Sequence, residues 1–300
     1  MHTPFFSIII PAYNAANDIA AALKSICSQE FQDMEIIVMD GVSADNTAAI
    51  VQDMAAHDSR IKLVVEKDAG IYDAMNKGVK QAAGKWVYFL GSDDRLHNEE
   101  VLKTVADFLQ NDQADLWYGD VLIVPGRNKY GGVFSRETLL YRNISHQAIF
   151  YKKDIFEKVG LYNLAYKKHA DWDFNIRCFE STAIRTQHRE VVVAEFREGQ
   201  TSAGHDQPFL LQVLIPKKVE DIGLRPQQLR GIREYDYCWR LFRNAAFGRE
   251  GKESTGITNR ILVAMLKFQK RISLSLLKNG FVSKFFMFIS YLQSLFIKAQ

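Results

Sequence analysis

Cysteine is scarce in this sequence, which has only Cys27, Cys178 and Cys238 among its 300 residues. The number is odd, the three lie far apart, and no CxxC pair occurs. This pattern argues against a disulfide framework and against a structural zinc site. We therefore expect the protein to work in a reducing compartment.

A signal peptide of the usual kind is also missing. The N-terminal stretch MHTPFFSIII has no basic region and reaches Pro11 and Asn14 before a long apolar segment can develop. We therefore expect a cytoplasmic protein.

Strong net charge is absent, because the formal value of +3 is too small to indicate a nucleic-acid partner. The charge is nevertheless uneven: no acid follows Glu253, whereas residues 261–300 mix apolar clusters with lysine and arginine. The longest uncharged run there, residues 285–297, is shorter than the ~20 residues that span a bilayer.

Residues 261–300 have two interpretations. A basic amphipathic segment can lie on an anionic membrane surface, which places the protein at the inner face of the cell membrane. A helical hairpin can instead pack on the rest of the chain or on a partner in a homo-oligomer. The sequence favours the membrane-surface interpretation of residues 261–300 only slightly over the helical hairpin.

Several familiar catalytic motifs are missing too. Residues 78–85, GVKQAAGK, approach a P-loop but have the wrong glycine spacing, and Trp86 stands where Ser or Thr must follow. No GxGxxG follows the first apolar run, and neither HExxH nor GxSxG occurs. No covalent nucleophile is evident.

What the sequence does contain is a run of β–α units. Apolar runs at 5–10, 35–39, 61–65 and 86–90 predict buried strands, and helices are expected over 18–29, 45–54 and 71–83. The alternation predicts an α/β fold with a doubly wound, mostly parallel sheet. Because these strands end in Asp, Asn or Gly, polar groups converge on one edge of the sheet.

The alternation loosens after residue 97. Strands are expected at 116–124, 129–134, 147–151 and 191–196, and helices at 101–109, 154–159 and 170–179. The pattern then becomes helical from Pro208. We expect one domain over 1–206, with halves of about 1–97 and 98–206, followed by a helical C-terminal extension over 207–300.

Two adjacent acids, Asp93 and Asp94, follow the apolar run Trp86–Leu90 directly. Ligands bind at the carboxyl ends of strands in open α/β sheets, so this pair suits a divalent cation and a phosphorylated substrate. A solvated turn is the alternative, because Asp is a common turn residue.

Five ordered blocks carry a family resemblance. They are SIIIPAYNAANDI (7–19), IIVMDGVSADNT (36–47), EKDAGIYDAMNKG (66–78), WVYFLGSDD (86–94) and HADWDFNIR (169–177). Together they resemble the family 2 inverting glycosyltransferases with the GT-A fold, over roughly residues 5–205. The resemblance implies a catalytic domain with a nucleotide-binding half and a mixed acceptor-side half.

The resemblance implies a nucleotide site at the first strand ends. Pro11, Ala12 and Tyr13 cradle the nucleoside, with the tyrosine ring beside the base. Asp40 hydrogen-bonds the base or ribose, since a carboxylate accepts bonds from N–H and O–H groups. Further nucleotide-side candidates are Asp68 and Lys77, although Lys77 also suits a solvated helix face.

The resemblance assigns the metal to Asp94, which binds Mg²⁺ or Mn²⁺ at the donor diphosphate, and turns Asp93 toward the ribose or a sugar hydroxyl. Gly91 and Ser92 replace the acids of a strict DXD motif, so one carboxylate carries most of the metal contact. Mg²⁺ tolerates this because it keeps several waters. The candidates for a second protein ligand are His146 and His205, each equally suited to a structural role.

Asp171 matches the general base of the family. Inversion requires a carboxylate that takes the proton of the acceptor hydroxyl. Ala170 stands where the family usually has Glu, and Asp173 is the alternative base. Two residues along a helix point about 200° apart, so both cannot face the acceptor. We favour Asp171, because Asp173 suits solvent or a pair with Arg177.

The resulting hypothesis is an inverting glycosyltransferase that uses a nucleotide-sugar donor, UDP-linked, and a glycan or lipid-linked acceptor in cell-surface polysaccharide biosynthesis. A nucleotidyltransferase is disfavoured, because the Gly-rich loop after the first strand is missing. A non-catalytic module that binds sugar nucleotides or membranes also remains open, given Ser92 and Ala170.

Overall fold

The computed structural model describes residues 2–126, 128–197, 206–214 and 217. The chain divides into two units, Met1–Ile215 and Pro216–Gln300, and almost all of the described residues belong to the first. His205, most of the predicted helical extension and the basic segment 261–300 lie outside the described residues. The predicted boundary at 206 stays a prediction.

The first half is a parallel sheet, as predicted. Strands β1 (Phe6–Ala12), β2 (Met34–Asp40), β3 (Ile61–Val65) and β4 (Trp86–Phe89) lie in the order β3-β2-β1-β4, with all three pairs parallel. All residues of β1, β2 and β4 are buried, which explains why their sequences are almost uninterrupted apolar runs.

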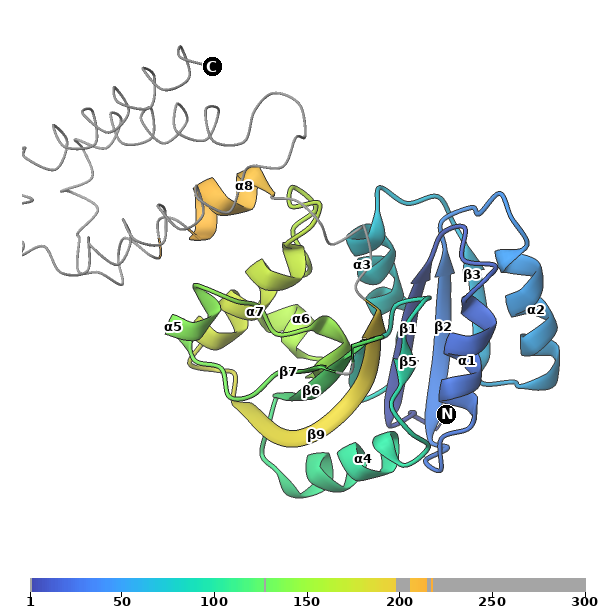
Figure 1. The fold of residues 1–300 in the computed structure, drawn as a ribbon, viewed down its shortest axis with the longest axis horizontal. Coiled ribbons are helices and arrows are strands. Elements are labelled where there is room, and N and C mark those ends of the chain that lie inside the picture. The colour runs from blue at the N-terminus through green and yellow to red at the C-terminus, as the bar shows by residue number, and fades with distance from the viewer. Residues whose placement is uncertain (1, 127, 198–205, 215–216, 218–300) are drawn as a thin grey trace, which may run out of the picture. The chain divides into compact units, whose positions relative to one another are not determined.

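Three helices cover the two faces of this half. The helices α1 (Ile19–Cys27) and α2 (Thr47–His57) lie on one face and α3 (Ile71–Gln81) lies on the other (Figure 1). The chain adds β2 and β3 on one side of β1 and then returns to add β4 on the other side. Because the crossovers are right-handed, the helix before β4 must lie on the opposite face of the sheet. Helix α3 packs closely on β1 at Gly78. A Cβ at this position would lie only 2.5 Å from Ile9 Cγ2, so a larger residue would not fit without a shift.

The sheet becomes mixed in the second half. Strand β8 (Ile149–Lys152) is antiparallel to both β4 and β6 (Leu116–Val124), and the long, curved β9 (Thr186–Arg197) runs parallel to β6 (Figure 1). The short strands β5 (Arg95–Leu96) and β7 (Asn128–Tyr130) pair with β9 and β6. The remaining elements are α4 (Val101–Asn111), α5 (Arg136–Leu139), α6 (Ile155–Lys158), α7 (Ala170–Glu180) and short helical segments at His146–Ala148, Gln207–Phe209 and Leu210–Leu214.

Three strand predictions in this half need correction. The strand expected over 129–134 ends at Tyr130, because Gly132 adopts a positive φ of 89° and its N–H binds Asp120 Oδ1. The strand expected over 147–151 begins only at Ile149, after a 3-10 turn. The last strand begins five residues earlier than expected, at Thr186, and covers polar residues that give no apolar run.

Helix α7 is buried on more sides than its sequence suggests. The spacing of Trp172, Ile176 and Phe179 predicts that all three share one buried helix face, but Trp172 and Phe179 are only partly buried. The buried residues of α7 point in several directions and are Ala170, Asp171, Asp173, Phe174, Asn175, Ile176 and Cys178. Tertiary packing therefore places two acids of this helix inside the protein.

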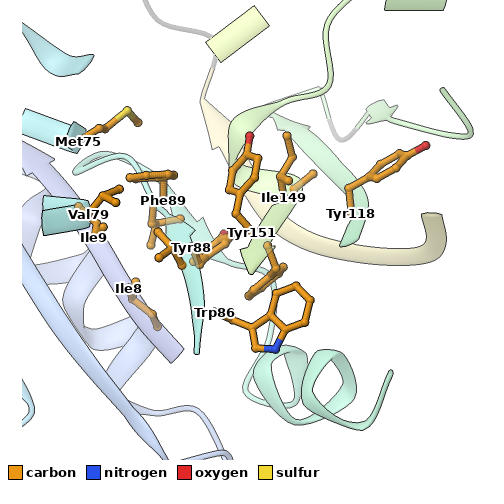
Figure 2. Close-up of a cluster of buried hydrophobic side chains, with 14 of the residues drawn as sticks. Ile8, Ile9, Met75, Val79, Trp86, Tyr88, Phe89, Tyr118, Ile149 and Tyr151 are labelled. Atoms are coloured by element: carbon orange, nitrogen blue, oxygen red, sulfur yellow. The ribbon is translucent and has the colours of Figure 1, made fainter. Parts of the chain in front are cut away.

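The core joins the two halves through β4. Tyr88 stacks on Phe150 of β8 with ring centroids 4.4 Å apart, and Phe89 lies between Ile9 and Val79 on one side and Tyr151 on the other (Figure 2). Fully burying one such side chain stabilises a fold by about 1.5–3 kcal/mol. Strand β4, which leads to Asp93 and Asp94, is therefore firmly anchored in the core.

Candidate active site

The loops after β1 and β2 are tied together. The buried Asp40 carboxylate accepts hydrogen bonds from the Ser43 N–H at 3.0 Å and the Ser43 hydroxyl at 2.5 Å. Asn14, with a φ of 52°, donates its N–H to Ser43 Oγ and accepts from the Ala44 N–H. Asp40 thus shapes the loop, and its direct contact with a base or ribose stays a prediction.

Tyr13 and Asp68 meet at Gly41. A Cβ at Gly41 would lie 2.5 Å from Asp68 Oδ2 and 3.4 Å from Tyr13 Cδ2. The Tyr13 side chain is 66% exposed, although Pro11 and Ala12 beneath it are buried. The structure therefore brings the predicted nucleoside residues to the carboxyl ends of β1, β2 and β3, with an aromatic face open to a ligand.

Lys77 holds the loop before α3. Its ammonium group lies 2.7 Å from Glu66 Oε1, 3.5 Å from Asp73 Oδ2 and 2.7 Å from the Lys67 carbonyl oxygen. The hydrogen bond with Glu66 raises the pKa of Lys77. The side chain is thus neither a solvated helix face nor free to reach far, and it fixes the segment that contains Asp68.

The two acids after β4 differ in environment. Asp93 is exposed, whereas Asp94 is only 2% exposed and accepts a 2.6 Å hydrogen bond from Gln147 Nε2 at Oδ2. A Cβ at Gly91 would lie 2.4 Å from Asp94 Oδ2 and 3.1 Å from Asp93 Oδ1. Gly91 thus allows both carboxylates to lie closer to the backbone than any other residue at this position would permit.

The residues present fit a divalent cation that binds mainly through the substrate. The described residues contain no group of three His, Cys, Asp or Glu side chains that could enclose a metal by themselves. Mg²⁺ binds through one or two carboxylates plus substrate phosphates, and Asp94, with Asp93 beside it at Gly91, can supply the carboxylates. His146 Nε2 is buried and makes no hydrogen bond within the described chain, so it stays a candidate ligand.

Asp171 lies in the first turn of α7 and is held from two sides. Its Oδ1 lies 2.6 Å from the Tyr72 hydroxyl of α3, and its Oδ2 accepts a 2.8 Å hydrogen bond from Asn143 Nδ2. Burial and the charge of Asp171 raise the pKa of Tyr72 well above its ordinary value. Tyr72 therefore stays a hydrogen-bond donor at any working pH.

Asp173, the alternative base, is already committed to an ion pair. Its Oδ2 lies 2.8 Å from Arg177 Nε, one turn along the helix, as the spacing predicts. It is buried rather than turned to solvent. Arg177 also donates to the carbonyl oxygens of Val159 and Leu161, so the pair ties α7 to the preceding loop.

Three polar residues of the site were not predicted: Tyr72, Asn143 and Gln147. Tyr72 lies inside the block EKDAGIYDAMNKG, where its helical position beside α7 could not be read from the sequence. Asn143 and Gln147 lie in RNISHQAIF, which has the composition of an ordinary polar loop. Asn143 lies four residues before the strand expected over 147–151 and Gln147 is the first residue of that strand, and neither position carries a motif.

Comparison with known proteins decides the family. The profile of Glycosyl transferase family 2 matches residues 7–192, more than half of the chain. The chain belongs to glycosyl transferase family 2. This family 2 enzyme is 44% identical over 215 residues to the "PGL/p-HBAD biosynthesis glycosyltransferase" of Mycobacterium bovis, a match that covers 70% of this chain and 84% of the relative.

A second relative matches a shorter part of the family 2 enzyme. The "GalNAc(5)-diNAcBac-PP-undecaprenol beta-1,3-glucosyltransferase" of Campylobacter jejuni is 40% identical over 95 residues, which cover 31% of each chain. Both relatives are glycosyltransferases by name. The comparisons support a glycosyltransferase of glycan biosynthesis and disfavour the nucleotidyltransferase.

Solved structures show that the family 2 enzyme has the GT-A fold. TarS of S. aureus in complex with UDP-GlcNAc matches with a TM-score of 0.62 at 20% identity, covering 85% of this chain and 76% of TarS. The mannosyltransferase PcManGT of Pyrobaculum calidifontis, in complex with GDP-Man and Mn²⁺, matches with a TM-score of 0.54 at 16% identity, covering 99% and 88%. At these identities the likeness shows the fold alone.

The described part of this family 2 enzyme has no helix that is both long and apolar enough to cross a membrane.

Proposed function

We propose that this family 2 enzyme is an inverting glycosyltransferase that moves a sugar from a UDP-linked donor to a glycan or lipid-linked acceptor in cell-surface polysaccharide biosynthesis. The observation that carries the proposal is the pair of buried acids Asp94 and Asp171, each held by an amide donor. Asp94 follows the carboxyl end of β4, and Asp171 begins α7, on the acceptor side.

The base chemistry follows from the surroundings of Asp171. As the acceptor oxygen attacks the anomeric carbon, its proton passes to the Asp171 carboxylate. The bond between the anomeric carbon and the diphosphate oxygen breaks, and UDP leaves with the electron pair. Tyr72 and Asn143 each donate one hydrogen bond to the Asp171 carboxylate, which leaves further lone pairs on its oxygens for the acceptor hydroxyl.

The donor end depends on residues at the sheet edge. Tyr13 presents its ring to the base, and Asp40, Asp68 and Lys77 hold or line the nucleoside loops. Asp94 holds Mg²⁺ or Mn²⁺ at the diphosphate, with His146 as a candidate second ligand. Such a cation, when bound, stabilises the negative charge that develops on the leaving diphosphate.

The comparisons support a nucleotide-sugar donor but do not distinguish a UDP-sugar from a GDP-sugar. The TarS complex contains UDP-GlcNAc and the PcManGT complex contains GDP-Man, so both nucleotide sugars are used on this fold. The lipid-linked acceptor is supported by the name of the Campylobacter jejuni relative, which acts on an undecaprenol-linked glycan. We propose that residues 261–300 bring the enzyme to the inner face of the membrane, where such acceptors are found.

The test is a screen of UDP- and GDP-sugars for Mn²⁺-dependent release of the nucleoside diphosphate. We expect turnover with a UDP-sugar, its loss in Asp171→Asn, and its loss in Asp94→Asn. The matched control is Asp107→Asn, which alters an exposed acid of α4. Unchanged turnover in Asp171→Asn would refute the assignment of the base.

A non-catalytic sugar-nucleotide module is the competing function. It predicts binding without reaction. Calorimetric titration with UDP, with and without Mn²⁺, distinguishes the two when it is combined with the screen. Tight UDP binding with no turnover of any donor would favour the module.

A further inference from the structure

One short segment contacts both acids of the proposed reaction. The segment Asn143–Gln147 (NISHQ) donates from Asn143 Nδ2 to Asp171 at 2.8 Å and from Gln147 Nε2 to Asp94 at 2.6 Å. Asp94 comes from the end of β4, and Asp171 from α7, far apart in the chain. The segment is therefore a direct physical link between the donor end and the acceptor end of the site.

Tyrosine hydroxyls fix both ends of this segment. The Tyr130 hydroxyl donates to the Asn143 carbonyl oxygen, and the Tyr88 hydroxyl donates to the Gln147 carbonyl oxygen at 2.8 Å. Tyr88 is wholly buried in the core of β4. The backbone on either side of His146 thus has little freedom to move relative to the sheet.

The orientation of each amide is also fixed. Asn143 Oδ1 accepts from Asn175 Nδ2 at 2.9 Å, and Asn175 Oδ1 accepts from the Tyr151 hydroxyl at 2.9 Å. The Asp171 carboxylate at the end of this chain only accepts, so Asn143 must turn its NH₂ group toward Asp171 and its oxygen toward Asn175.

Gln147 is oriented in the same manner. Its Oε1 accepts from the Ser145 hydroxyl at 2.6 Å, which leaves Nε2 for Asp94. Both amides therefore present donors to the two acids, and neither can present its oxygen without losing a buried hydrogen bond.

We infer that Asn143 and Gln147 are positioning residues, and that the segment Asn143–Gln147 holds the proposed base and the proposed metal-binding acid at a fixed spacing. The inference rests on the proposed function of Asp171 and Asp94. Asn143 orients the Asp171 carboxylate toward the acceptor. Gln147 orients the Asp94 carboxylate, as partners of metal-binding carboxylates commonly do.

Few titratable side chains near Asp171 complicate the interpretation of a pH–rate profile. Its charge acts on the tyrosines Tyr72, Tyr130, Tyr151 and Tyr162, and burial raises the pKa of all four, so they stay neutral. On α7 itself, Asp173 is paired with Arg177. His169 and Lys168 precede Asp171 in the chain, and Arg142 adjoins Asn143.

The experiment compares Asn143→Ala and Gln147→Ala in the full-length protein, using the UDP-sugar identified by the screen. For Asn143→Ala we expect kcat to fall about ten-fold to a hundred-fold, as loss of a hydrogen bond to a charged group predicts. The acid limb of its pH–rate profile moves to higher pH, because the charged form of the base loses a donor. Binding of Mn²⁺ in the presence of UDP stays unchanged.

Gln147→Ala gives the opposite pattern. We expect Mn²⁺ binding in the presence of UDP, measured by calorimetry, to weaken about ten-fold. The acid limb of the pH–rate profile, measured at saturating Mn²⁺, stays in place. UDP binding without metal is the internal control and does not change.

Matched variants separate positioning from stability. Asn76 is a buried asparagine that binds only the main chain of Tyr162, so Asn76→Ala loses amide hydrogen bonds without touching either acid. We expect it to lower stability and leave both readouts unchanged. Tyr72→Phe keeps the ring, removes the other donor to Asp171, and is expected to shift the acid limb as Asn143→Ala does.

The outcomes are distinct. If Asp171→Asn keeps transfer activity, the proposed function fails. If Asp171→Asn and Asp94→Asn are inactive but both Asn143→Ala and Tyr72→Phe leave the acid limb in place, the positioning of the base is refuted. If Gln147→Ala binds Mn²⁺ as the wild type does, the positioning of Asp94 is refuted.

Discussion

Gly41 lies directly against Asp68, because a Cβ at Gly41 would approach Asp68 Oδ2 to 2.5 Å. Real Cβ atoms essentially never lie so close to another atom, so the end of the Asp68 side chain must shift when Gly41 is replaced. The pair brings the loop after β2 and the loop after β3 together beside the exposed ring of Tyr13. The proposed nucleoside site thus depends on a glycine.

Gly41→Ala is expected to weaken UDP binding about five-fold, since displacing the Asp68 carboxylate costs about 1 kcal/mol, the low end for overpacking. Calorimetric titration with UDP measures the change. In the double variant Gly41→Ala/Asp68→Ala the clash is absent, so Gly41→Ala should cost less in that background than in the wild type. Equal costs in the two backgrounds would show that the clash is not the cause.

Asp173→Asn tests which acid of α7 is the base. The variant loses the ion pair with Arg177, so we expect the free energy of unfolding to fall by about 1–3 kcal/mol. Transfer activity stays near the wild-type value, because Asp171 keeps its contacts with Tyr72 and Asn143. Urea denaturation and a rate measurement check the two parts, and inactivity of a folded Asp173→Asn protein would support Asp173 as the base.

Asp120 gives a pH dependence of stability. Burial opposes its ionisation, but the Gly132 N–H, His188 and Lys129 outweigh burial and lower the pKa of Asp120. A lowered pKa adds stability above the ordinary value of about 4, and this stability is lost as the pH falls through the lowered pKa. Asp120→Asn should therefore destabilise the protein more at pH 7 than at pH 3.

Urea denaturation of the wild type and Asp120→Asn at both pH values measures this difference. The exposed Asp93→Asn variant is the control, with little difference at either pH. A constant difference between wild type and Asp120→Asn would mean that the charge of Asp120 does not contribute.

The basic segment 261–300 predicts salt-sensitive membrane binding. Replacing Lys267, Lys270 and Arg271 together by Gln should weaken binding to anionic vesicles on the order of a hundred-fold, at about 1 kcal/mol for each charge. Sedimentation with phosphatidylserine-containing vesicles measures the effect, and phosphatidylcholine vesicles are the control. Equal binding by the triple variant and the wild type would contradict a membrane role for these charges.

The sequence predicted the parallel half of the fold well because each central strand is buried on both faces. Its strands β1, β2 and β4 read as continuous apolar runs, and no competing pattern exists. The mixed half was predicted less well. Tyr130 ends a strand because of the backbone of Gly132, and β9 begins in the polar run Thr186–Glu190, where only pairing with β6 explains the strand.

The candidate site divides in a similar way. Asp94 and Asp171 could be selected from their chain positions and the family resemblance, and the structure places both inside the protein. Asn143 and Gln147 could not, because an amide becomes a positioning donor only through tertiary contacts with Asp171 and Asp94. Their pattern in the sequence is that of a loop.

The most direct test of the central claim is the anomeric configuration of the product. The account predicts direct attack of the acceptor hydroxyl, activated by Asp171, on the anomeric carbon of the donor. With a UDP-α-sugar, proton NMR of the transferred sugar should therefore show a β-linked product. An α-linked product would contradict the single-displacement mechanism and the role of Asp171 as its base.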